Sequence, residues 1–254
     1  MSTITRFARS ALLCLVIAFS VFTPASPVSA ATDKLPDLGM ARLQDIDIVK
    51  TADGRRLLRF TTIIVNMGAG AFEIHGQRPD SSTQTMSVTQ RIYDSAGGYR
   101  DVATNATVLY DVGDGHNHWH VKDLETYDLI RMDNGVKVGT GAKTGFCFYD
   151  NRRYVFNLPG EPTSKVYTNC GTSGDLVVVT GLSIGWEDIY PYNVAYQYVD
   201  ITGLKAGRYR LRVTADNFYQ FTESNESNNF TWVDIQLRSK KGTGFKIIAY
   251  GPHI

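Results

Sequence analysis

The sequence predicts an all-β protein, an antiparallel β-sandwich with long irregular loops in a single domain. Short runs rich in β-branched and aromatic residues recur along the chain, and Gly, Asn and Asp bound them. Helical periodicity is nearly absent after residue 30, and many strands at this spacing are typical of a sandwich. The runs are Arg56–Val65, Ser87–Tyr93, Leu124–Arg131, Leu176–Leu182, Val194–Ile201, Arg208–Ala215 and Phe230–Leu237.

The run Arg208–Ala215 alternates most clearly. Tyr209, Leu211 and Val213 fall on one face of a strand, and the positions between them hold arginines. This pattern predicts a half-buried antiparallel strand. Turn signals separate the runs, at Ala52–Gly54, Ser95–Gly98, Met132–Gly135 and Lys205–Gly207.

The first 30 residues have the features of an export signal. Arg6 and Arg9 precede an apolar run, Ala11–Phe22, and Val28–Ala30 offers small residues for cleavage. The apolar run is shorter than the stretch of about 20 residues that a membrane span needs. We therefore expect a secreted, extracellular protein of residues 31–254, not held at a membrane after cleavage; the alternative is a retained anchor.

Charge and cysteine content narrow the function classes. Removal of the signal lowers the 26 basic residues to 24, against 25 acidic ones, which argues against nucleic acid as a partner. Two cysteines then remain, Cys147 and Cys170, and in a secreted chain they predict one disulfide. Residues 31–254 are enough for a substantial core, and no Pro/Ser-rich linker divides them.

Three of the five histidines lie within five residues, at His116, His118 and His120. On a strand, this spacing projects all three imidazoles from one face, while Trp119 and Val121 face the other way. Three imidazoles with an open position suit Cu(II) or Zn(II), and the Irving–Williams order favours copper. The residues alone leave a zinc hydrolase open, as well as an exposed polar strand or an adventitious metal site.

The residues around the triplet resemble the lysyl oxidase family. Gly115–His120, followed by Asp123 and Tyr127–Leu129, is similar to the family's copper-binding signature. Three further blocks follow the family pattern: Leu57–Phe60 with Asn66 and Gly68 is similar to its first strand, Gly141–Cys147 to its cofactor-lysine segment, and Asp188–Tyr190, running to Thr202, to its cofactor-tyrosine segment.

The resemblance implies that residues 31–254 are the catalytic domain of a copper amine oxidase. Such an enzyme uses oxygen to convert primary amines, with peptidyl lysine as the first expectation, into aldehydes, releasing hydrogen peroxide and ammonia. Its Cu²⁺ would be bound by His116, His118 and His120, and its lysine tyrosylquinone would form from Lys143 and Tyr190.

The resemblance leaves the general base open. Asp123 matches an acid of the family pattern, so it is the candidate, with a solvated strand-end acid as the alternative. The family has a histidine just before its Tyr-Asp-Leu stretch, where this chain is one residue shorter and has Thr126. Only Cys147 matches the disulfide pattern of the animal members, which indicates a microbial relative and weakens collagen or elastin as substrate.

A second metal site is predicted in Glu223–Asn229, a loop rich in oxygen donors of the kind that Ca²⁺ prefers. In the family pattern, this loop meets the Pro-Asp-Leu stretch near the start of the domain. The alternative is an ordinary polar turn. The expected calcium ligands are Asp37, Leu38 through its carbonyl, Glu223, Asn225, Asn228 and Asn229.

Two other function classes stay open at this point. One is a secreted metal-dependent hydrolase that uses the same three histidines, and the other is a non-catalytic β-sandwich exported for adhesion or cell-wall interaction. The sequence indicates neither the preferred amine nor the oligomeric state.

Overall fold

A computed structural model describes residues 30–111, 115–238 and 241–254, and these form strands and loops with no helix. The predicted all-β class is therefore confirmed. Residues Ala31–Ile254 form one compact unit, and nothing described is a helix long and apolar enough to cross a bilayer. The predicted export signal falls almost wholly outside the described residues, so it stays a prediction.

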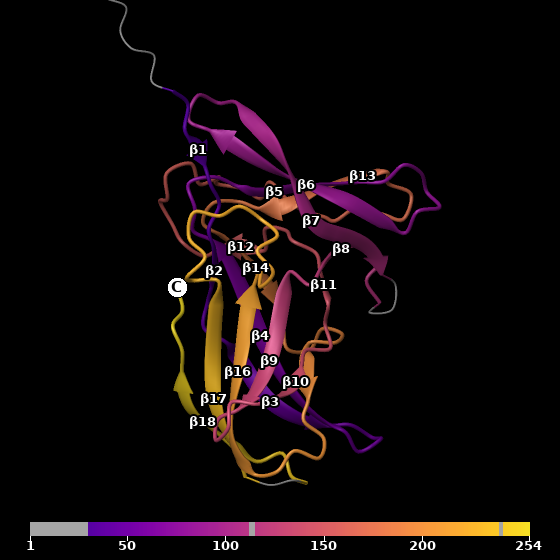
Figure 1. Cartoon of the computed structure of the whole chain (residues 1–254), viewed down its shortest axis with the longest axis vertical. Helices are drawn as coiled ribbons and strands as arrows, with labels where there is room; N and C mark the ends of the chain where they lie inside the picture. Colours follow the sequence, from indigo (N-terminus) through magenta and orange to yellow (C-terminus); the bar gives the residue numbers. More distant parts are fainter. Residues whose placement is uncertain (1–29, 112–114, 239–240) are drawn as a thin grey trace, which may run out of the picture. The chain divides into compact units, whose positions relative to one another are not determined.

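The described strands form three antiparallel sheets, with the strand labels of Figure 1. The seven-stranded sheet contains β1 (Asp33–Lys34), β5 (Phe72–Gln77), β6 (Thr85–Asp94), β7 (Tyr99–Asp111), β8 (His118–Lys122), β11 (Gly145–Phe146) and β13 (Val177–Leu182). The six-stranded sheet contains β2 (Leu38–Met40), β3 (Gln44–Lys50), β4 (Arg56–Asn66), β12 (Arg152–Arg153), β14 (Trp186–Tyr190) and β15 (Tyr198–Asp200). The five-stranded sheet contains β9 (Glu125–Arg131), β10 (Lys137–Thr140), β16 (Gly207–Ala215), β17 (Phe230–Leu237) and β18 (Phe245–Tyr250).

The strand β4 is the centre of the six-stranded sheet. It pairs with β2 and β3 along one edge and with β14 and β15 along the other. Nearly all of its side chains are buried, on both faces. A strand buried on both faces needs apolar residues at odd and even positions alike, which explains its continuous apolar run.

The main core lies where β4 meets the five-stranded sheet. Phe60 and Ile64 of β4 belong to one buried cluster with Leu129 of β9, Leu211 of β16 and Val233 of β17. Burial of side chains of this size contributes about 1.5–3 kcal/mol each. Figure 1 shows β16 and β17 running side by side along the direction of β4.

The seven-stranded sheet lies at one end of these two sheets, where Figure 1 shows β5, β6 and β13 crossing the view. The β6–β7 hairpin turns at a predicted turn signal, because Asp94 Oδ1 accepts the backbone N–H groups of Ala96 and Gly98. The short β11 is the edge strand of this sheet, and it pairs with β8, which carries His118 and His120.

Two expected strands differ from the structure. Val194–Ile201 is a strand only over β15, because Val194 and Gln197 instead make turn hydrogen bonds to the carbonyls of Pro191 and Val194. The ladder of β8 begins at His118, which pairs with Asp111, so His116 lies ahead of the strand rather than within it. The other six predicted runs are strands, and Tyr209, Leu211 and Val213 are fully buried, as the alternation predicts.

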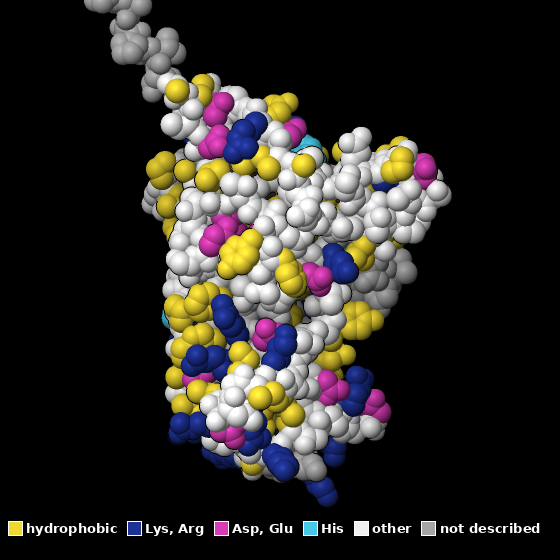
Figure 2. All heavy atoms as spheres, in the orientation of Figure 1, with side chains coloured by type: hydrophobic (Ala, Val, Ile, Leu, Met, Phe, Trp, Pro, Cys, Tyr) yellow, Lys and Arg dark blue, Asp and Glu magenta, His cyan; other side chains and the backbone are white. Residues whose placement is uncertain are grey.

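Charges of both signs are interspersed on the face of the molecule shown in Figure 2, where magenta acidic and dark blue basic side chains lie among hydrophobic ones. This mixture matches the near-neutral charge balance of the chain. Basic side chains are more frequent toward the lower end of this face than toward its upper end.

Candidate functional site

The three histidines meet in space although only two lie on β8. The ligating nitrogens of His116, His118 and His120 all lie within 4.8 Å of one another. The ring centroids of His118 and His120 are 4.5 Å apart, and those of His116 and His118 are 5.4 Å apart. His120 is buried, whereas His116 and His118 are half-buried, so the cluster faces solvent from one side only.

The strand that carries these ligands is fixed from its other face. The Trp119 side chain is buried there, its backbone N–H donates to the Cys170 carbonyl at 3.0 Å, and its indole N–H donates to the Thr172 carbonyl at 2.7 Å. Of the three histidines, His118 lines a cavity of about 350 Å³, together with Tyr149 and the two cysteines. Three converging imidazoles beside such a cavity fit Cu(II) or Zn(II) with an open coordination position.

Gly145 on β11 leaves the space that His120 occupies. A Cβ added at Gly145 would lie 2.9 Å from the Cβ of His120 and 3.2 Å from its Cγ. We expect Gly145→Ala to displace His120 and weaken copper binding by about 10- to 100-fold, the range for changes beside a ligand. Copper titration measures this, and an unchanged affinity with a shifted melting temperature would mean that the strain is relieved elsewhere.

Lys143 and Tyr190, the predicted cofactor pair, are brought together. Lys143 lies in the segment before β11 and is buried, and its Nζ is 5.5 Å from the centroid of the Tyr190 ring. The same Nζ is 5.4 Å from the ring centroid of Phe146. Because Phe146 pairs in register with Val121, the segment that follows Lys143 runs alongside the strand that carries His118 and His120.

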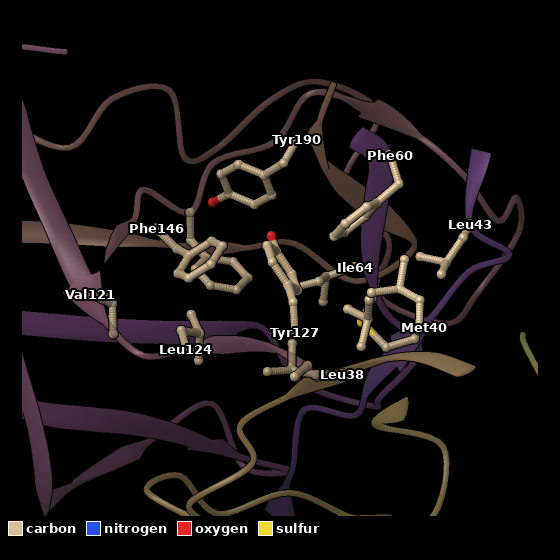
Figure 3. Packing of buried hydrophobic residues seen from close by; sticks show 14 of the residues in the cluster. Leu38, Met40, Leu43, Phe60, Ile64, Val121, Leu124, Tyr127, Phe146 and Tyr190 are labelled. Carbon is tan, nitrogen blue, oxygen red and sulfur yellow. The ribbon is translucent and has the colours of Figure 1, made fainter. Parts of the chain in front are cut away.

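Tyr190 is held in one orientation. Its hydroxyl donates to the Cys147 carbonyl at 2.8 Å, and its ring meets Phe146 edge-on at 5.1 Å between centroids. Figure 3 shows Tyr190, Phe146 and Tyr127 gathered in one space. Burial, with the nearby charge of Asp188, raises the pKa of Tyr190 well above its ordinary value, so the phenol keeps its proton at neutral pH.

Two buried carboxyl groups face this pair, and the sequence reasoning did not select either. Glu125 Oε2 accepts hydrogen bonds from Tyr127 at 2.6 Å and from Thr62 at 2.9 Å, while its Oε1 has no hydrogen-bond partner among the described residues. Neither carboxylate oxygen of Asp188 has a hydrogen-bond partner among the described residues. The Tyr190 hydroxyl donates to the Cys147 carbonyl instead.

The alternation of side chains along their strands could have indicated that both acids face the core. Glu125 shares a face with Tyr127 and Leu129, and Asp188 shares one with Tyr190. Burial raises the pKa of Glu125 to about 7, although the Tyr127 and Thr62 hydrogen bonds and the Lys143 charge lower it. Burial raises the pKa of Asp188 well above its ordinary value.

Asp123, the predicted candidate base, follows β8 and is hydrogen-bonded through its backbone. Its backbone has a positive φ of 55°, and its N–H donates to the Thr144 carbonyl at 2.6 Å. Its side chain lines a separate cavity of about 350 Å³ with Lys122, Phe218 and Gln220. These contacts do not include the Tyr190 ring, so the role of Asp123 as base stays a prediction.

The predicted disulfide is present between Cys147 and Cys170, with Cα atoms 5.9 Å apart. It connects two parts of the site, because the Cys147 carbonyl accepts the Tyr190 hydroxyl and the Cys170 carbonyl accepts the Trp119 N–H. The disulfide therefore connects the segment that holds the Tyr190 hydroxyl to the segment that holds the histidine strand.

A second cluster of oxygen donors lies in the predicted calcium loop. The carboxylates of Asp216, Glu223 and Glu226 have oxygens within 4.8 Å of one another. The amide oxygens of Asn228 and Asn229 are buried there without a hydrogen-bond partner among the described residues. Three carboxylates this close together, with further amide oxygens in the same loop, form a donor set that fits Ca²⁺.

The cluster differs in membership from the predicted ligands. Asn225 is exposed, and its Oδ1 accepts the N–H and hydroxyl of Ser227 in a local turn. Asp37 accepts from the Asn228 amide at 2.7 Å, and the Leu38 N–H, rather than its carbonyl, contacts Glu223. Asp216 and Glu226 were not predicted, because the pairing of β16 with β17 brings them together.

Comparison with known proteins gives one consistent result. A family model described as lysyl oxidase matches residues 98–245. Lysyl oxidase homolog 3 of Homo sapiens is 33% identical over 175 residues, which cover 69% of this chain and 18% of that protein. Lysyl oxidase homolog 2 of Homo sapiens is 30% identical over 205 residues, which cover 80% of this chain and 20% of that protein. The chain thus spans about a fifth of the length of these relatives.

Proposed function

Because this chain belongs to the lysyl oxidase family, we propose that it is a secreted, copper-dependent amine oxidase. It oxidises primary amines, including the side-chain amine of peptidyl lysine, to aldehydes and releases hydrogen peroxide and ammonia. The observation that supports this most is the 5.5 Å separation between Lys143 Nζ and the Tyr190 ring centroid, next to three converging imidazoles.

Each residue has a distinct part in this proposal. His116, His118 and His120 would hold the copper, which together with oxygen would supply the oxidising capacity that a quinone at Tyr190 requires. Lys143 supplies the amine that attaches to that ring. The Cys147 carbonyl orients the Tyr190 hydroxyl, and the Phe146 ring packs against both Lys143 and Tyr190.

Access for substrate and oxygen is from the half-buried side of the histidines. The cavity of about 350 Å³ beside His118 is lined by Tyr149, Asn117 and Asn169 and by both cysteines. It is large enough for an extended lysine side chain, so we propose it as the entry for the amine.

Activity with Cu²⁺ but not with Zn²⁺ would distinguish an amine oxidase from a zinc hydrolase. The metal-free protein, reloaded with Cu²⁺ in air, should release peroxide when a primary amine such as a lysine peptide is added. Protein reloaded with Zn²⁺ should release none, because zinc has no redox chemistry. Peroxide-free hydrolysis of peptides or esters by the zinc-loaded protein would overturn the proposal.

We also propose that the carboxylate cluster binds Ca²⁺ and joins β2 to the β16–β17 hairpin. Without a cation, the cluster is self-repelling: burial and the charges of Glu226 and Asp216 raise the pKa of Glu223 to about 8. Burial also raises the pKa of Asp216 to about 6. A divalent cation that binds such carboxyl groups displaces their protons.

The stability of the calcium-free protein should therefore fall as pH rises. Glu223 goes from its ordinary pKa of 4.5 in the unfolded chain to about 8 in the folded one, so the folded state holds the extra proton between these values. The free energy of unfolding therefore decreases as the pH rises from 4.5 to about 8. Millimolar Ca²⁺ should restore the melting temperature at the upper end of the window and have little effect at the lower end.

The variant Glu223→Gln provides the control for this prediction. It should remove both the pH-dependent loss and most of the calcium effect on the melting temperature. An equal calcium effect in Glu223→Gln and in the wild-type protein would exclude this cluster as the binding site.

A further inference from the structure

The proposed cofactor chemistry requires Lys143 to lose a proton inside the protein. Only a neutral amine has the lone pair that forms a bond to carbon, and a lysine at neutral pH is ordinarily an ammonium. Lys143 is buried, so a proton acceptor is needed within the site. The charge of Lys143 acts on two described carboxyl groups, those of Glu125 and Asp188, and its Nζ lies over the Tyr190 ring.

Glu125 lies on the side of the site where the Lys143 segment is anchored. The Gly141 N–H donates to the Tyr127 carbonyl at 2.8 Å, and Gly141 packs so closely on the Tyr127 ring that an added Cβ would lie 2.4 Å from it. The Tyr127 hydroxyl in turn donates to Glu125 at 2.6 Å. In Figure 3 this hydroxyl points toward the Tyr190 ring.

The surroundings of Glu125 leave one of its oxygens available. Oε2 is occupied by the hydroxyls of Thr62 and Tyr127, whereas buried Oε1 has no hydrogen-bond partner among the described residues. The charge of Lys143 also acts on this carboxyl group, lowering its pKa against the effect of burial. A buried carboxylate with a spare oxygen, coupled to a buried lysine, has the features of a proton acceptor.

We propose that Glu125 accepts the proton that the Lys143 ammonium must lose before its nitrogen bonds to the Tyr190 ring. In this step an N–H bond of Lys143 breaks, an O–H bond forms on Glu125, and both groups become neutral. No electrons are transferred, and oxidation of the ring by oxygen belongs to the proposed function, on which this inference rests.

Asp188 is the rival acceptor, and the chemistry favours Glu125. A general base works best when its pKa lies near the working pH, and that of Glu125 is raised to about 7. The pKa of Asp188 is raised well above its ordinary value, by burial first and by the charge of Glu125 as well. An ionised Glu125 therefore favours the protonated form of Asp188.

The test follows formation of the Lys143–Tyr190 crosslink by peptide mapping after Cu²⁺ is added to the metal-free protein in air. In the wild-type protein, the rate of crosslinking should rise with pH through about 7, as the Glu125 carboxyl ionises. In Glu125→Gln the rate should fall by about 10²-fold or more, and this inflection should disappear. Glu125→Asp keeps a carboxylate and should restore part of the rate.

Glu73→Gln is the matched control, because Glu73 is another buried glutamate that accepts two phenol hydroxyls, from Tyr93 and Tyr167. It should crosslink at the wild-type rate. Equal rates and pH profiles in Glu125→Gln and wild type would overturn the role of Glu125, as would loss of the rate in Asp188→Asn alone.

The wild-type profile keeps the test decisive if Glu125→Gln does not fold, since a rate that does not rise through about pH 7 would also overturn the role. A wild-type protein that never forms the crosslink would overturn the proposed function itself.

Discussion

Replacing Tyr190 by phenylalanine is expected to abolish amine oxidation while leaving the fold intact. Phenylalanine keeps the ring and its edge-on contact with Phe146 but has no hydroxyl from which a quinone can form. Since the cofactor carries the redox chemistry, the rate should fall to the uncatalysed level, a loss of at least about 10⁶-fold. Redox-cycling stain and phenylhydrazine absorbance on the copper-loaded protein measure the cofactor directly.

Tyr209→Phe is the control for this experiment. Tyr209 is also a buried tyrosine whose hydroxyl donates to a backbone carbonyl, that of Lys205 at 2.9 Å. Each variant loses its hydrogen bond to a carbonyl, worth about 1 kcal/mol of unfolding free energy. Tyr209→Phe also loses the hydrogen bond that its hydroxyl accepts from Arg131 at 3.1 Å, so it is at least as demanding a control for stability. Only Tyr190→Phe should lose the stain, and full staining of that variant would remove Tyr190 from the cofactor.

Removal of His120 should have the second large effect. It is the most buried of the three histidines, and its ring lies 4.5 Å from that of His118 and 6.3 Å from that of His116. In His120→Ala two imidazoles remain, so copper affinity should fall by more than the 10- to 100-fold that outer partners of a metal site are worth. Copper content by elemental analysis should fall, and the Lys143–Tyr190 crosslink should not form.

His253→Ala is the matched control, because His253 is exposed near the C-terminus and outside the cluster. It should retain one tightly bound copper per chain. If His120→Ala kept the same copper content as His253→Ala, the triplet would not be the copper site.

The strands could be predicted from the sequence wherever one face is buried. Alternation identified β16 because Tyr209, Leu211 and Val213 all face one core, and continuous apolar character identified β4. The short strands β11 and β12 carry too few residues for any period to appear. The strand expected over Val194–Ile201 was too long because local turn hydrogen bonds replace ladder pairing at its start.

The site was predictable in the parts that are local in sequence. The spacing of the three histidines indicated their convergence, although His116 reaches the cluster from a loop and not from the strand. The family pattern paired Lys143 with Tyr190, which no local rule connects. The role of Glu125 could not be predicted in this way, because its neighbours come from β4 and the Lys143 segment as well as from β9.

The second metal cluster illustrates the same limit. Glu223 is in the predicted loop, but Asp216 follows β16 and joins it only because Thr214 pairs with Phe230 across the hairpin. Asn225, which looked like a ligand from its position, is occupied by a turn to Ser227. Sequence proximity therefore selected the loop, and the pairing of β16 with β17 adds the carboxylate of Asp216 to the cluster.

The central claim is that this chain makes its own cofactor from Lys143 and Tyr190, and a peptide map tests it most directly. The metal-free protein is loaded with Cu²⁺ in air, digested and analysed by mass spectrometry, with a Zn²⁺-loaded sample beside it. We predict one crosslinked species that contains Lys143 and Tyr190 in the copper sample and none in the zinc sample. Recovery of both residues in separate, unmodified peptides after copper loading would contradict the claim.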